Sequence, residues 1–228
     1  MRITPAVGRI MVITCLMFGL QWLIRLICGG PALEGWLALL LQTPQGLPLW
    51  QVWRLFTYAL LHYDISHLFW NMLGLWLVGA TLEEYLGAAR LYRCYAFSVF
   101  CGAISALLCA ALGLNSGADY ITLMGASAGT MGILFTFIGL APQSTMYLWC
   151  LIVIPVKALY LGLILGAIQV GGLLFHGASH TSYSAHLGGI IAGLLLAQAL
   201  RRRWDKRVYE AVAELKKRWK RRHIRIVK

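Results

Sequence analysis

Six long apolar runs constrain this chain more than any other feature of its sequence. Each approaches the roughly 20 residues that cross a hydrocarbon core of about 30 Å. Inside lipid the backbone must satisfy its own hydrogen bonds, and alternating strand patterns are absent, so we expect helices. The runs extend from about Ile10 to Ile27, Ile65 to Thr81, Cys94 to Leu114, Leu123 to Ala141, Ala158 to Phe175 and Ser184 to Leu200.

The composition excludes an ordinary soluble domain. Hydrophobic residues are 60% of the 228, charged residues only 12%, and the mean hydropathy is +0.71. We therefore predict an all-α, polytopic membrane protein, with a six-helix membrane domain over residues 1–200 and a basic tail over residues 201–228. The first run has the apolar character of a signal peptide, but Gln21 and Arg25 interrupt it, which favours a retained helix.

Basic residues in the short connections predict the orientation. Arg2 and Arg9 precede the first run, Arg90 and Arg93 follow the second, and Lys157 precedes the fifth. These residues and the tail fall on one side, which the positive-inside rule makes cytoplasmic, with both termini inside. The expected location of this multi-pass protein is the bacterial inner membrane.

The first outer connection, residues 28–64, is too apolar to lie in water, yet its apolar runs are too short to cross a membrane. Its tryptophans favour the interface, so we expect a half-buried loop at the outer surface. Residues 145–155 look similar on the inner side. Pro155 followed by Lys157 indicates that the fifth helix begins only afterwards, and one longer helix from Tyr147 is the alternative.

The tail carries most of the charge, because thirteen Lys or Arg against three acids supply +10 of the formal net +12. We predict a basic amphipathic helix that rests on anionic membrane lipids, with a solvated, disordered tail as the alternative. No nucleic-acid partner is expected, since a basic run beside a span usually serves orientation. The apolar residues of the tail recur at helical spacing: Trp204, Val208, Val212, Leu215 and Trp219.

Three of the apolar runs contain polar residues suited to acyl transfer. In residues 125–129, Gly-Ala-Ser-Ala-Gly, a serine is flanked by glycines inside an apolar run. His67 and Asn71 are four residues apart and share one helix face. His186 lies in the sixth run. All three polar sets lie near the expected outer ends of their spans. Intramembrane ionisable residues favour a functional role, and three such sets strengthen that interpretation.

If the fourth and sixth runs are in contact, a serine nucleophile and a histidine base can lie side by side. Gly189 and Gly193 share a face with His186 and permit close approach of a neighbouring helix, which would bring His186 to Ser127. A neutral imidazole is the usual base for a serine hydroxyl. The developing oxyanion needs donors. The candidate donors are the Ser127 backbone NH, the Asn71 amide and a His67 ring NH.

Structural roles are the alternatives for each set. A lone serine in a transmembrane helix commonly bonds back to its own helix, and the soluble nucleophile elbow needs a preceding strand that residues 119–124 hardly provide. His67 with Asn71 would serve as an interhelical hydrogen-bonding pair, and His186 as a packing residue. The remaining histidines, among them His62, fall in loops or the tail and are interpreted as incidental.

At these residues the chain resembles the rhomboid intramembrane serine proteases, over roughly residues 8–200. The resemblance implies a six-helix rhomboid-like bundle, with Ser127 as nucleophile, His186 as its base, and Asn71 and His67 in the oxyanion hole. It also implies transmembrane protein substrates, cut near the outer membrane face, with no cofactor and no metal. The matching motifs are Gly125-Ala126-Ser127, His67-x-x-x-Asn71, Ala185-His186-Leu187-Gly188-Gly189, Trp53-Arg54, and Leu82-Glu83 with Gly87.

The chain departs from that family at two places. Family members often have glycine directly after the serine, where this chain has Ala128. They often have an aromatic ring four residues after the serine, packed on the base, where this chain has Met131. Methionine can still pack against an imidazole edge. Neither change removes a catalytic group.

No acidic third member of the site stands out. Of the eight acids, only Glu34, Asp64 and Asp119 lie on the expected outer side, so we predict a Ser/His dyad, with Asp64 and Asp119 as loop caps or interface residues. We expect scaffold roles for Arg54, which can tie loop carbonyls together, and for Glu83, which can receive backbone NH groups at the inner surface.

Two other function classes remain open. A non-catalytic, rhomboid-like membrane chaperone would use the same helix-binding surface, but such relatives usually lack the serine or the histidine. A small transporter or proton channel would explain polar residues in the spans, yet not the glycine-flanked serine, and matching broken-helix repeats are not apparent.

Overall fold

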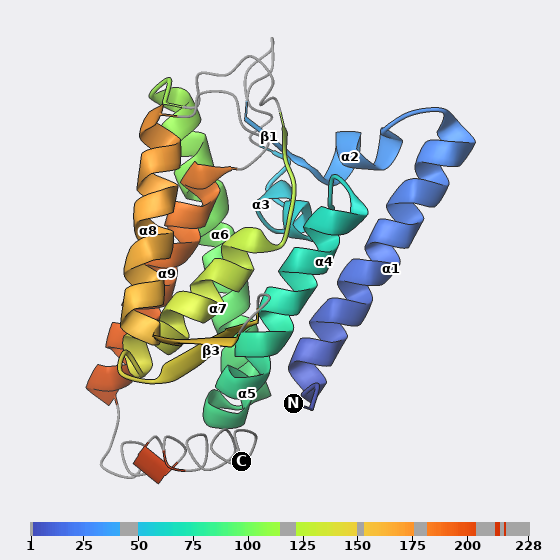
Figure 1. Ribbon diagram of the computed structural model, residues 1–228. Helices are drawn as coiled ribbons and strands as arrows, with labels where there is room; N and C mark the ends of the chain where they lie inside the picture. Colours follow the sequence, from blue (N-terminus) through green and yellow to red (C-terminus); the bar gives the residue numbers. More distant parts are fainter. Residues whose placement is uncertain are drawn as a thin grey trace.

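The computed structural model describes residues 2–41, 50–114, 122–149, 153–175 and 182–203, together with 213, 214 and 217. The long helices run alternately up and down one bundle, and the N-terminus lies at the same end as the last turn of α9 (Figure 1). The helices are α1 (Pro5–Cys28), α2 (Ala32–Leu37), α3 (Arg54–Thr57), η1 (Tyr58–Leu60), α4 (Ile65–Gly74), the π-helical turn η2 (Leu75–Gly79), α5 (Ala80–Leu86), α6 (Ala88–Ala111), α7 (Ser127–Leu140), α8 (Ala158–Phe175) and α9 (Tyr183–Arg203). The strands are β1 (Leu39–Leu40), β2 (Thr122–Leu123), β3 (Thr145–Trp149) and β4 (Val153–Lys157).

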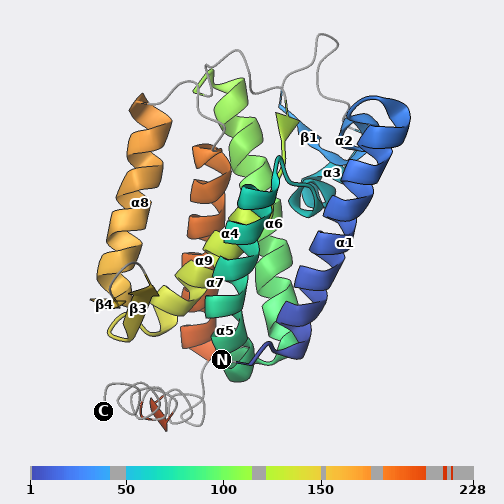
Figure 2. The ribbon, with the colours of Figure 1, turned by 45° about the vertical axis from the view of Figure 1, so that its right-hand side comes forward.

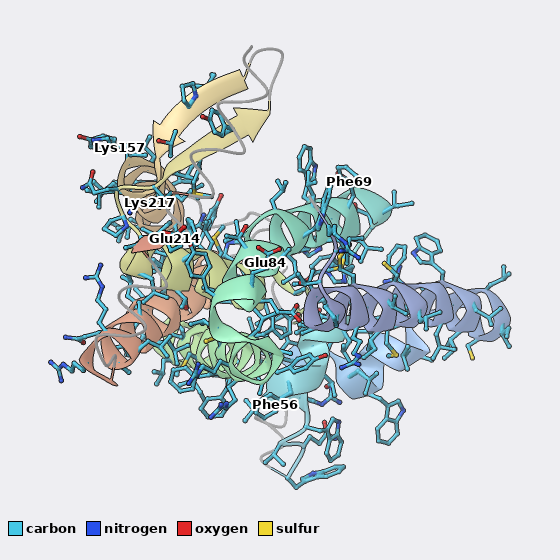
Figure 3. The ribbon with its side chains drawn as sticks, turned by 90° about the horizontal axis from the view of Figure 1, so that it is seen from below. Phe56, Phe69, Glu84, Lys157, Glu214 and Lys217 are labelled. Carbon is cyan, nitrogen blue, oxygen red and sulfur yellow. The ribbon has the colours of Figure 1, made fainter. Side chains whose placement is uncertain are left out.

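Five helical stretches of the described chain are long and apolar enough to cross a membrane. One of them is the continuous rod of α4, η2 and α5, from Ile65 to Leu86. The prediction of a helical, multi-pass membrane protein is confirmed. Many side chains that face outward from the bundle are apolar, as Phe56 and Phe69 illustrate in Figure 3, and both are about half exposed. Lipid-facing surfaces of this kind are expected in a membrane bundle.

The fourth predicted span differs from the other five, because α7 has only 14 residues. At 1.5 Å per residue it extends about 21 Å, less than a hydrocarbon core of about 30 Å. It begins at Ser127 rather than at Leu123, since Thr122 and Leu123 form the strand β2, antiparallel to β1 of the first loop. Non-helical backbone at membrane depth is tolerated where protein buries it, and Figure 2 shows α7 between α4 and α9. The start of α7 is therefore an interior site.

A β-hairpin joins α7 to α8, which the expectation of helices alone did not foresee. Strands β3 and β4 pair antiparallel, from Thr145 opposite Lys157 to Trp149 opposite Val153. Valine and isoleucine on β4 favour extended backbone. Seen from below in Figure 3, the hairpin extends away from the bundle, with Lys157 where α8 starts. Helix α8 begins at Ala158, so the predicted late start is confirmed and a longer helix from residue 147 is excluded.

The described part of the first loop is half-buried, as predicted. Trp36 is 62% exposed, whereas Arg54 is almost completely buried. The guanidinium of Arg54 donates to the carbonyls of Gly35 and Ala38, so it ties the loop together in the way that the sequence suggested. The loop is fixed to the bundle by the Tyr58 hydroxyl, which donates to the carbonyl of residue 99 on α6 at 2.8 Å.

Glu83 fastens α5 to the start of α1. Its carboxylate accepts the backbone NH groups of Ala6 at 2.9 Å and Val7 at 3.0 Å, and the Thr4 hydroxyl. These NH groups have no partner within their own helix, and a negative charge there also suits the helix dipole. The predicted scaffold role of Glu83 is confirmed.

Several predictions fall outside the described residues. Almost all residues of the amphipathic helix expected over 201–228 are outside the described residues, and Asp119 is outside them too. The division of the chain at residue 200 therefore stays a prediction, although α9 continues to Arg203.

Candidate active site

Ser127 is the first residue of α7, and the backbone before it has an unusual shape. Gly125 has φ of +128°, a value that L side chains rarely adopt. A Cβ there would also lie 2.6 Å from Cε1 of His67, so no other residue fits between this turn and that ring. The glycine two positions before the serine is thus needed for the turn and for the approach of His67.

Ser127 and His186 are in direct contact. The Nε2 atom of His186 lies 2.7 Å from the Ser127 Oγ, across the contact between α7 and α9. His186 is 9% exposed and Ser127 is only partly buried. The two residues that sequence reasoning paired are brought together, at a distance where an imidazole can accept a hydroxyl proton.

Close packing of two helix backbones produces this contact. A Cβ on Gly189 would lie 2.2 Å from the carbonyl oxygen of Ala128, and one on Gly193 would lie 2.4 Å from that of Gly132. The predicted small-residue face of α9 therefore rests directly on α7, one turn below His186. Thr136 reinforces the contact, since its hydroxyl lies within hydrogen-bond reach of the carbonyls of Gly132 and Gly193.

The second nitrogen of the His186 ring has a partner that the sequence analysis missed. Nδ1 lies 2.8 Å from Oε1 of Gln169, a 5% exposed side chain on α8. No local motif marks this residue. The available signal was that Gln169 is the only amide side chain in the apolar sequence of α8.

His67 and Asn71 lie on α4, whose start is fixed by Asp64. The Asp64 carboxylate accepts the His67 NH at 2.8 Å, so of the two predicted roles, loop cap or interface residue, Asp64 has that of a cap. The Asn71 amide donates one N–H to the His67 carbonyl at 2.9 Å. An amide nitrogen has a second N–H, which remains for another acceptor. The His67 ring packs against Gly125, so this pair is next to the serine turn.

His62, interpreted as incidental, is instead a fully buried part of the site. Its Nε2 accepts the backbone NH of Ala126 at 3.4 Å, and its ring centroid lies 4.9 Å from that of His67. Burial, with a smaller contribution from nearby His67, lowers the pKa of His62 to about 3, so the ring is neutral. Sequence reasoning failed here because a loop position does not predict burial.

His62 is held by the first helix. Its backbone NH donates to Oε1 of Gln21 at 3.1 Å, and Nε2 of Gln21 donates to the His62 carbonyl at 2.8 Å and to Glu34 at 2.9 Å. Arg25 pairs with the same Glu34 carboxylate. The polar residues that interrupt the first apolar run thus bind the first loop and the serine turn to α1.

Ala128 and Met131, where the chain departs from the family pattern, both pack against other parts of the protein. Ala128 is fully buried, and a Cβ on Gly102 of α6 would lie 2.5 Å from the Ala128 methyl. The missing side chain at Gly102 thus makes room for the extra methyl of Ala128. Met131 is partly buried against the main apolar core. Gly129 is covered by the Tyr95 ring, which a Cβ would meet at 2.5 Å.

Within the described residues, no three His, Cys, Asp or Glu side chains lie together in a way that could hold a metal ion. Two of the histidines at the site have other partners, since His186 contacts Ser127 and Gln169 and His62 accepts the backbone NH of Ala126. The chemistry that this arrangement can perform is that of a nucleophilic hydroxyl with an adjacent neutral base.

Comparison with known proteins gives a consistent assignment. A family model described as the rhomboid domain matches residues 49–203, more than half of the chain. The rhomboid protease GlpG of Yersinia pestis (strain Pestoides F) is 31% identical over 188 residues, which cover 82% of this chain and 59% of that protein. The same values hold for rhomboid protease GlpG of Yersinia pseudotuberculosis serotype O:3 (strain YPIII). RHOMBOID-like protein 1 of Arabidopsis thaliana is 31% identical over 147 residues, 64% of this chain and 34% of that protein. The chain spans less than two thirds of the length of these curated relatives.

Proposed function

The chain belongs to the rhomboid family, and on this basis we propose that it is an intramembrane serine endopeptidase. Its substrates are transmembrane segments of other membrane proteins, cut near the outer membrane face. The observation that carries the proposal is the 2.7 Å contact between His186 Nε2 and Ser127 Oγ at the buried start of α7. A rhomboid-like protein that only bound helices would have no use for this contact.

Ser127 is the nucleophile and His186 its base. As the Ser127 oxygen attacks the carbonyl carbon of the scissile peptide, His186 Nε2 takes the hydroxyl proton and then delivers it to the leaving amide nitrogen. Water then attacks the acyl carbon and loses a proton to the same nitrogen, which returns that proton to the Ser127 oxygen as the acyl bond breaks. No cofactor is needed for these steps.

The oxyanion of each tetrahedral intermediate is stabilised by donors around the serine turn. The Ser127 backbone NH is available because it opens α7, where the first NH groups have no helical partner. The free N–H of Asn71 and a ring N–H of His67 are the further donors. The Ala126 NH is not counted among them, since His62 already accepts it. Such donors act strongly where water is excluded.

The orientation that we propose places the serine end of α7 near the outer face. Helix α6, with Arg90 and Arg93 near its start, and helix α8, which follows Lys157, both begin at the bundle end that holds the N-terminus (Figure 1). The positive-inside rule makes this end cytoplasmic, with both termini inside a bacterial inner membrane. The basic tail over residues 201–228 then contacts anionic membrane lipids. We do not propose nucleic acid as a partner.

Cleavage of a model transmembrane substrate in reconstituted bilayers tests the proposal. Ser127→Ala and His186→Ala should each abolish turnover while the thermal unfolding temperature stays near that of the wild type. A suitable control is Ile168→Ala, which alters an exposed side chain of α8. Turnover by purified, folded Ser127→Ala at a rate near wild type would remove Ser127 from the nucleophile role.

A further inference from the structure

A buried amide in a lipid-embedded helix requires an explanation. Four residues of α8 are buried, namely Ala158, Gly162, Gln169 and Gly172, and they follow one side of the helix. The other three have no polar side-chain atoms. Burying an amide without a hydrogen-bond partner costs free energy, and the cost is high where water is absent. The position of Gln169 therefore depends on the partner that it finds.

That partner is the proposed catalytic base. Oε1 of Gln169 lies 2.8 Å from Nδ1 of His186, and Nε2 of the same ring faces Ser127. A neutral imidazole has one protonated nitrogen and one that accepts. Because an amide oxygen only accepts, the bond to Gln169 requires the proton on Nδ1. The lone pair is then on Nε2, directed at the serine hydroxyl.

The opposite arrangement would disable the base. If the NH₂ group of Gln169 faced His186, Nδ1 would accept and Nε2 would carry the proton, so the ring could donate to Ser127 but not take its proton. The loss of activity when a triad histidine is held in the wrong tautomer shows how large this effect can be. The side chain that contacts Nδ1 therefore decides whether the contact with Ser127 is productive.

We propose that Gln169 is a positioning residue that fixes His186 in the Nδ1–H tautomer and orients its ring toward Ser127. This inference rests on the proposed protease function and extends the predicted dyad by a neutral third member. An uncharged acceptor suits the site, because an ionised carboxylate at this depth would carry a large desolvation cost. The amide of Asn plays the equivalent part beside the histidine of some cysteine proteases.

The packing of α8 holds Gln169 in reach. A Cβ on Gly172 would lie 2.3 Å from the Tyr183 ring, so α8 and the first turn of α9 touch one helical turn from Gln169. Tyr183 is three residues before His186, on the same helix. The two ends of the hydrogen bond are thus fixed by a contact that does not involve the reacting groups.

Substitution tests the role directly. Gln169→Met preserves the length of the side chain but removes the acceptor, and should lower kcat by about 10- to 100-fold with little change in KM, since a small misplacement of a reacting group can cost about 10²-fold. The control is Ile168→Met on the exposed side of α8. Turnover of a folded Gln169→Met within three-fold of wild type overturns the assignment.

A measurement on the protein with Gln169 in place does not depend on the folding of a Gln169 variant. Nitrogen NMR of histidine-labelled protein in detergent distinguishes the two neutral tautomers, and His186→Ala identifies the signal. Protonated Nδ1 with unprotonated Nε2 is the expected result, and the reverse overturns the inference. Ser127→Ala separates this outcome from failure of the protease proposal. If wild-type protein gives no cleavage that depends on Ser127, the proposed function fails, whereas normal Ser127-dependent cleavage with the wrong tautomer rejects only the role of Gln169.

Discussion

Adding one methyl group at Gly189 should separate the two reacting residues. The new Cβ would lie 2.2 Å from the Ala128 carbonyl oxygen, about 1.2 Å short of the 3.4 Å at which ordinary contact begins. The obstacle is backbone, so a side-chain rotation cannot relieve it, and α7 and α9 must move apart. If the full shift reached the site, the 2.7 Å between His186 Nε2 and Ser127 Oγ would become about 3.9 Å, outside the hydrogen-bond range of about 2.7–3.2 Å.

The expected cost is a fall in kcat of about 10²-fold, equivalent to about 2.7 kcal/mol, because a misplacement of about 1 Å can have this effect. Overpacking should also lower stability by about 1–3 kcal/mol. The assay is turnover of a transmembrane substrate in proteoliposomes, with thermal unfolding in detergent. Gly166→Ala is the matched control, because nothing lies within 4 Å of its new Cβ. A Gly189→Ala protein as active and as stable as wild type would refute the reasoning.

Three further changes test other parts of the structure. Asn71→Ala should lower kcat by about 10²–10³-fold at nearly constant KM, since an oxyanion donor matters most in the transition state; a raised KM at unchanged kcat would contradict this. The pKa of His62 is lowered to about 3, below its ordinary value of about 6.5, so its contribution to stability is complete above pH 6.5 and is lost as pH falls. Between pH 7 and 5 the loss is about 2 kcal/mol, and His62→Gln should flatten this part of the stability curve, measured by unfolding in detergent. An equal slope in both proteins would contradict it. Arg54→Lys should destabilise the protein by about 2 kcal/mol, because one ammonium cannot replace a fork that serves two buried carbonyls; an unchanged unfolding temperature would be the contrary result.

Features set by local sequence were predictable. The apolar runs located the long helices, Asp64 was predicted as a loop cap or an interface residue, and Glu83 was predicted to receive backbone NH groups. The pairing of Ser127 with His186 was also accessible, since Gly189 and Gly193 mark a face where backbones meet. For the helices and the Asp64 cap the signal and its consequence lie within one or two helical turns, whereas Glu83 and His186 contact partners 77 and 59 residues away in the sequence.

Features set by distant partners were not predictable in the same way. The role of Gln169 depends on the packing of α8 against α9, and the burial of His62 depends on Gln21 from α1. The late start of α7 arises because β2 pairs with the first loop, a contact between segments more than 80 residues apart. A polar residue in an apolar run indicates that a partner exists, but only the tertiary structure identifies it.

The central claim is that Ser127 is a nucleophile activated by His186, and covalent labelling tests it most directly. A serine-reactive fluorophosphonate probe is added to the purified protein in detergent, and the modified residue is identified by peptide mass spectrometry. We predict one adduct on Ser127, absent in Ser127→Ala and formed much more slowly in His186→Ala. Labelling of Ser127 at the wild-type rate without His186, or no adduct on Ser127 in folded wild-type protein, would contradict the account.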